Sequence, residues 1–137
     1  SKEAVNHPSH YAAPYRREVI ELTARFDFTT GNAMKYVLRC RFKARPAEDL
    51  QKARWYLNYF IDHPETGFCL KEGAQAVIDD FLADLHHPED AFCSDASRFL
   101  KSLCAAVAIR DFSKRRPFNE EAIKALDALI ARASKTV

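Results

Sequence analysis

Residues 31–39 read Gly31-Asn32-Ala33-Met34-Lys35-Tyr36-Val37-Leu38-Arg39. In an α-helix, which turns by about 100° per residue, the apolar side chains of this stretch share one face. Asn32, Lys35 and Arg39 lie on the opposite face, with Tyr36 beside them. One side of the helix can therefore pack into a core while the other presents an amide, an ammonium and a guanidinium.

The start of this helix suggests a ligand site. Thr29 or Thr30 is expected to cap it, and Gly31 is expected to leave room for a ligand backbone or phosphate at the first turn. The alternative is that Lys35 and Arg39 are ordinary solvated charges.

Basic residues concentrate in the first part of the chain. Residues 1–60 contain 11 Lys and Arg against 6 Asp and Glu, whereas residues 61–137 contain 10 against 13. One cationic run has no acid within it: Lys35, Arg39, Arg41, Lys43 and Arg45. This run favours an anionic partner. The net charge of +2 is too small, and the run too local, to indicate binding of duplex nucleic acid.

The composition indicates an all-α protein. The 137 residues are 47% apolar and include only three glycines, and the apolar residues recur with helical period. No run of 18 apolar residues and no signal-peptide pattern is present, so a cytoplasmic protein without a membrane partner is expected.

No metal site or familiar catalytic motif is expected. The four cysteines are widely spaced, which favours reduced, partly buried thiols, and adjacent His86 and His87 would point about 100° apart on a helix. The sequence also lacks the Walker A, G-x-G-x-x-G, H-E-x-x-H and G-x-S-x-G patterns.

Two regions are predicted. Residues 1–63 form a compact domain of about three helices with an extended N-terminal arm, and residues 64–137 form a three-helix C-terminal extension. The boundary is the break at residues 63–67. The predicted helices cover residues 16–25, 31–41, 46–62, 71–86, 94–112 and 119–133, with Ser94 or Asp95 and then Asn119 as caps of the last two. Residues 113–117 are interpreted as a basic loop, with a solvated turn favoured over a binding loop.

The arm carries hydrogen-bonding side chains around Pro8. His7, His10 and Tyr11 are expected to fold over the helix of residues 31–39 and to contact phosphate or sugar rather than a metal. A frayed terminus is the alternative.

The helix of residues 46–62 predicts self-association. Trp55, Tyr56, Tyr59 and Phe60 give it more aromatic surface than a short three-helix packing covers, so a homo-oligomer is expected.

Several ordered motifs over residues 5–61 resemble a family of small phage proteins that includes the podovirus-type nucleotide kinase lacking a Walker motif. They are Asn6-His7-Pro8-Ser9-His10-Tyr11, Glu18-Val19-Ile20, Gly31-Asn32-Ala33 with Lys35-Tyr36 and Arg39, and Glu48-Asp49-Leu50 with Lys52-Ala53 and Trp55-Tyr56-Leu57. The resemblance implies a nucleotide-binding protein of the infected bacterial cytoplasm. It also implies nucleoside monophosphate kinase activity, with a nucleoside triphosphate as phosphate donor.

The residues and the resemblance point to the same surface. His7, His10, Tyr11, Asn32, Lys35, Tyr36 and Arg39 are the candidate nucleotide-binding residues, and no residue is assigned as catalytic. Three hypotheses stay open: the kinase, a non-catalytic protein that sequesters a host signalling nucleotide as an anti-defence sponge, and a helical module that docks an acidic protein or single-stranded nucleic acid.

Overall fold

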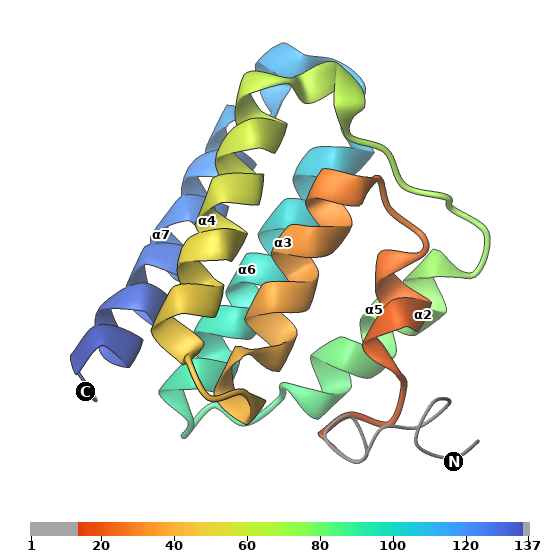
Figure 1. Ribbon diagram of the computed structural model, residues 1–137. Coiled ribbons are helices and arrows are strands. Elements are labelled where there is room, and N and C mark those ends of the chain that lie inside the picture. Colours follow the sequence, from red (N-terminus) through yellow and green to blue (C-terminus); the bar gives the residue numbers. More distant parts are fainter. Residues whose placement is uncertain (1–13, 136–137) are drawn as a thin grey trace, which may run out of the picture.

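The computed structural model describes residues 14–135, which fold into helices around one hydrophobic core (Figure 1). The predicted all-α class is confirmed, and in this part of the chain the only β-type pairing is an isolated bridge between Phe26 and Cys69. The elements are α2 (Val19–Thr23), α3 (Phe28–Arg39), η1 (Cys40–Phe42), α4 (Pro46–Asp62), η2 (Pro64–Thr66), α5 (Ala74–Asp84), α6 (Ala91–Ala108), η3 (Phe112–Lys114) and α7 (Arg116–Lys135).

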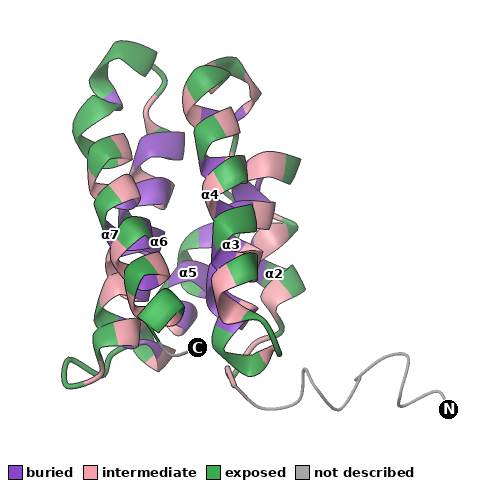
Figure 2. Ribbon diagram, turned by 60° about the vertical axis from the view of Figure 1, so that its left-hand side comes forward, coloured by how far each residue is buried: buried purple, intermediate pink, exposed green. Residues whose placement is uncertain are grey.

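The long helices pack in a ring of four. α3 packs on α4, α4 on α7, α7 on α6 and α6 on α3, while α2 packs against both α3 and α5. Figure 2 shows the buried residues on the sides of these helices that face one another. Helices on both sides of the break after residue 63 therefore contribute to the same core.

The bounds predicted for α4 are confirmed. Pro46 occupies its first turn, where its fixed φ suits a helix and no amide hydrogen is missed, and Glu48 and Asp49 lie at the positive end of the helix dipole. The helical spacing of the sequence predicts a core stripe of Leu50, Ala53, Leu57, Phe60 and Ile61; the first four are buried, whereas Ile61 is only partly buried.

The start of α3 differs from the prediction. Its cap is Asp27, not Thr29 or Thr30: the Asp27 carboxylate accepts hydrogen bonds from the Thr30 amide (3.0 Å) and the Thr29 hydroxyl (2.6 Å). Asp27 also accepts from the Phe68 amide at 2.9 Å, so this buried side chain ties α3 to the loop after η2.

The predicted bounds of three other helices also differ from the structure. The first helix is shorter than residues 16–25, and its residue Ile20 is 63% exposed. α5 begins at Ala74 rather than Lys71, because Gly73 has a left-handed φ of 71° that a helix cannot contain. α6 begins at Ala91 because Asp90, not Ser94 or Asp95, accepts from the Phe92 amide at 3.0 Å.

The prediction that residues 113–117 form a solvated basic loop is wrong, above all for Arg115. Arg115 is only 1% exposed, and it precedes α7, which starts at Arg116 rather than after Asn119. Its guanidinium donates to the carbonyl oxygens of Pro64 (2.9 Å), Ile109 (2.9 Å) and Val107 (3.4 Å). The buried guanidinium is thus hydrogen-bonded to backbone carbonyl oxygens inside the fold.

The helices of residues 14–135 include none that is both long and apolar enough to cross a lipid bilayer. All four cysteines are free, with Cys40 and Cys93 buried and Cys69 and Cys104 partly buried.

Candidate functional site

An open groove lies where the end of α3 meets the beginning of α4. It has a volume of about 470 Å³. Its lining residues are Lys35, Tyr36 and Arg39 from α3, Lys43, Ala44 and Arg45 from the connector, and Glu48, Asp49 and Lys52 from α4.

Local structure explains why these residues meet. The core side of α3 is formed by buried apolar residues such as Met34 and Val37, which leaves Lys35, Tyr36 and Arg39 at the opposite side. After α3, η1 reverses the chain so that α4 packs back along α3. The first turns of α4 therefore add their polar side chains to those of the end of α3.

The groove carries an excess of positive charge. Its lining holds five Lys and Arg side chains against two carboxylates. One carboxylate, that of Glu48, lies 3.4 Å from Arg45. Two ammonium groups lie close to the Tyr36 ring, with Lys35 Nζ at 4.5 Å and Lys52 Nζ at 5.7 Å from the ring centroid. A site of this kind attracts anions and offers an aromatic face to a ring.

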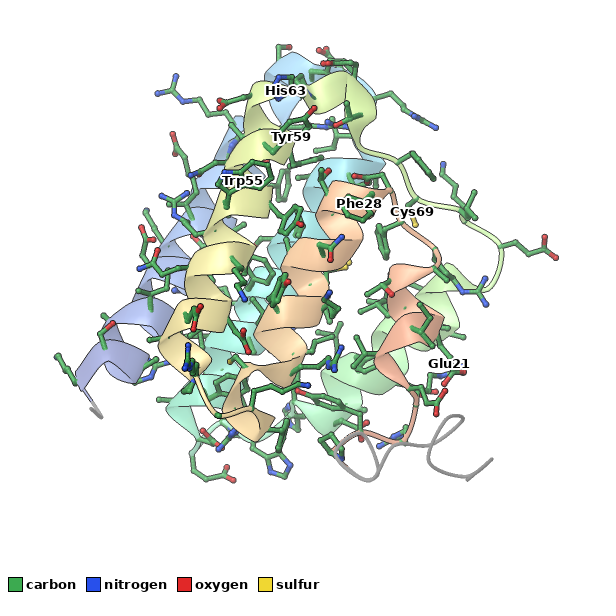
Figure 3. All side chains as sticks on the ribbon, in the orientation of Figure 1. Glu21, Phe28, Trp55, Tyr59, His63 and Cys69 are labelled. Carbon is green, nitrogen blue, oxygen red and sulfur yellow. The ribbon has the colours of Figure 1, made fainter. Side chains whose placement is uncertain are left out.

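An aromatic row leads away from the groove along α4. The rings of Tyr36 and Tyr56 stack at 6.1 Å, those of Trp55 and Tyr59 at 5.8 Å, and Tyr59 stacks on His63 at 4.0 Å. Figure 3 shows Trp55, Tyr59 and His63 following one another along α4. We call Tyr36, Tyr56, Trp55, Tyr59 and His63 the aromatic row.

Of the seven residues predicted to bind a nucleotide, the structure brings Lys35, Tyr36 and Arg39 together in the groove. Asn32 does not line it, and its side-chain amide instead donates to the Phe28 carbonyl oxygen at 2.8 Å. His7, His10 and Tyr11 lie outside the described residues.

Two other basic residues lie where the sequence did not predict them. Lys52 was not predicted as a site residue, yet it reaches the groove because η1 folds α4 back against α3. Arg41, which belonged to the predicted cationic run, is instead 3.0 Å from Asp90 and stacks over the Phe92 ring at 4.5 Å. Arg41 therefore fastens η1 to the start of α6 rather than lining the groove.

The role expected for Gly31 is corrected. Gly31 is buried, and a Cβ atom at this position would lie 3.1 Å from the carbonyl oxygen of Thr23. Its missing side chain lets the end of α2 approach α3 closely, and it does not open the first turn of α3 to a ligand.

No cluster of three or more His, Cys, Asp or Glu side chains suited to a metal ion occurs between residues 14 and 135. The thiol nearest to the groove in sequence, that of Cys40, is held protonated by burial, which raises its pKa to about 12. A nucleophilic cysteine at the groove is therefore not supported.

Residues 5–58 match a family described as proteins of unknown function (DUF3310). The matched segment contains α2, α3 and most of α4, and it includes every residue that lines the groove. No curated protein and no solved structure matches the chain.

Proposed function

We propose that this protein binds a nucleotide, with the phosphates in the basic groove and the base against the aromatic row. The observation that supports this most is the convergence of Lys35, Arg39 and three further cations in one groove that Tyr36 also lines. The phage-family resemblance of residues 5–61 supports the same ligand class.

The cations of the groove would bind the phosphates, and the Tyr36 ring would bind the base. The Arg39 guanidinium offers a planar fork of donors to phosphate oxygens, and Lys35 acts as a point charge beside it. Tyr36, already stacked on Tyr56, offers a ring on which a base can stack.

Two fates of the ligand remain as alternatives within this proposal. In the kinase hypothesis, Lys35 and Arg39 stabilise charge on a phosphoryl group moving from a nucleoside triphosphate to a nucleoside monophosphate. In the sequestration hypothesis, the same groove holds a host signalling nucleotide unchanged. Incubation with mixed nucleoside mono- and triphosphates separates them: new phosphorylated products support the kinase, whereas unchanged ligand recovered after heat denaturation supports sequestration.

The binding test uses Lys35→Ala, Arg39→Ala and the double variant, titrated with nucleotides by isothermal calorimetry. Each single variant is expected to weaken binding about tenfold or more, because a charge-assisted contact contributes roughly 1.5–3 kcal/mol. Lys124→Ala, which removes an exposed charge from α7 outside the groove, serves as the matched control. Full nucleotide affinity in the double variant would overturn the proposal.

The arm can be tested separately. Deletion of residues 1–11 removes His7, His10 and Tyr11 and is expected to abolish binding while the helical circular-dichroism signal persists. Bound phosphate raises the pKa of a histidine above its usual value near 6.5, so affinity is expected to increase as pH falls from about 8 to 6. If the truncated protein binds the nucleotide as tightly as the intact protein, the arm takes no part and the binding site is confined to the groove.

The proposal also includes a homo-oligomer in the cytoplasm of an infected bacterium. The exposure of Trp55 in the aromatic row supports self-association, whereas Phe60 is buried in the core and adds no surface to it.

A further inference from the structure

A second cavity, of about 520 Å³, is built from other elements than the groove. Its walls come from α5 and α6, with Phe26 and the loop around Cys69 closing one side. Most of its lining therefore comes from residues 64–135, outside the segment that the family model matches.

The interior of this cavity is apolar. Phe26, Ile78 and Val107 are buried side chains that reach it, and Leu82 adds a partly buried one. Its two thiols do not carry charge at neutral pH: burial raises the pKa of Cys104 to about 12 and also raises the pKa of Cys69. A hydrocarbon chain can therefore lie in this interior without separating any charge from water.

Three cations stand among the lining residues, and no carboxylate does. They are Lys71 from the loop before α5, Lys101 from α6 and Arg110 from the loop after α6. None of these three side chains makes an ion pair or a hydrogen bond with another residue between positions 14 and 135. This differs from Arg16, Arg17 and Arg41, whose guanidinium groups are paired with aspartates.

An apolar interior with unpaired cations at its lining has the chemistry of an amphipathic anion site. We propose that the cavity between α5 and α6 binds a medium-chain fatty acid, with the acyl chain inside and the carboxylate among Lys71, Lys101 and Arg110. The cavity volume falls within the range of small-molecule sites. A mononucleotide fits it poorly, because the interior offers few hydrogen-bonding partners to a base or sugar.

Chain length gives the first test. Octanoate, decanoate and dodecanoate, each below its micellar concentration, are titrated by isothermal calorimetry against the full chain. Each added pair of methylenes is expected to raise affinity by roughly an order of magnitude until the cavity is filled. Decan-1-ol and decylammonium, which keep the chain but lose or invert the charge, are expected to bind at least tenfold more weakly than decanoate. Equal affinity for decanoate and decylammonium would overturn the proposal.

Two variants on α6 locate the site. Ala105→Phe fills the cavity from a half-exposed position and is expected to abolish decanoate binding, while Lys101→Glu should weaken it at least fivefold. Their matched controls on α7, Ala131→Phe and Lys124→Glu, change exposed positions that do not line the cavity and should bind normally.

Circular dichroism and thermal melting show whether each variant is folded, and displacement of anilinonaphthalene sulfonate provides an independent binding signal. Unchanged decanoate affinity in folded Ala105→Phe would place the ligand elsewhere and refute the assignment. Loss of affinity in the α7 controls would refute it equally.

Discussion

The guanidinium of Arg115 donates a 2.9 Å hydrogen bond to the carbonyl oxygen of Pro64, which joins the residue before α7 to the turn after α4. The guanidinium also stacks over the rings of Phe112 (4.6 Å) and Phe60 (5.1 Å). Burial, together with repulsion from Arg110, lowers the pKa of this guanidinium, yet an arginine so affected remains charged at neutral pH. One cation thus holds together two ends of helices that lie far apart in the sequence.

Replacing Arg115 with Met is expected to destabilise the protein by about 3 kcal/mol. The methionine keeps much of the apolar stem but leaves three buried carbonyl oxygens without their donor. Urea unfolding followed by circular dichroism measures the change. Lys114→Met, at an exposed neighbouring position, is the control and should change stability by less than about 0.5 kcal/mol. Equal stability of the two variants would show that the buried hydrogen bonds of Arg115 contribute nothing.

Asp27→Ala is expected to lower the free energy of unfolding by about 2–4 kcal/mol. It removes the cap of α3 and also leaves the Phe68 amide without its acceptor, so two separate losses add. Asp111→Ala removes an exposed cap from η3 and provides the comparison, with an expected cost of about 1 kcal/mol or less. The prediction fails if urea midpoints of the two variants shift equally.

Asp90 gives the protein a defined sensitivity to acid. The hydrogen bond from Arg41 lowers the pKa of the Asp90 carboxyl below its usual value. A lowered native pKa means that its stabilisation is complete above the unfolded pKa, near 3.9, and is lost as pH falls through the native value.

Asp90→Asn keeps a good helix cap but cannot titrate. Between pH 5 and pH 2.5 it should therefore lose less stability than the wild type. The difference should be under about 1 kcal/mol, because the pair is partly exposed to solvent. Unfolding curves at several pH values measure this. Glu65→Gln, an exposed carboxyl without an ion pair among the described residues, should follow the wild-type profile.

Trp55→Glu is expected to convert the proposed oligomer into monomers. Trp55 is 60% exposed, so its replacement leaves the core intact while placing a charge in the middle of the aromatic row. Sedimentation velocity measures the effect, and Ile20→Glu, at an equally exposed apolar residue on α2, should leave the oligomer unchanged. A wild-type protein that sediments as a 15.7 kDa monomer at micromolar concentration would contradict the prediction.

Features that depend on neighbours in the sequence were predicted well. Pro46 and the acids after it mark the start of α4, and the spacing of Leu50, Ala53 and Leu57 identifies its buried side. The grouping of Lys35, Tyr36 and Arg39 also followed from the geometry of one helix. In each of these cases the residues that determine the feature lie within one helix, a few positions apart in the sequence.

Features that depend on distant partners were missed. Arg115 resembles its solvated neighbours until Pro64 and Val107 surround it, and Gly31 resembles a ligand-binding glycine until Thr23 packs against it. Lys52 joins the groove only because a later helix returns alongside α3. Helical periodicity describes one element at a time and contains no information on which elements meet.

The ring of four helices has a consequence for the evolution of such chains. α6 and α7 cover the apolar sides of α3 and α4, so a chain that stopped after α4 would need a second molecule to cover them. Residues 64–135 thus supply within one chain what a shorter protein would have to obtain by association. The groove is built wholly from residues 35–52. Gain or loss of the later helices therefore changes the quaternary structure first and leaves the basic groove in place.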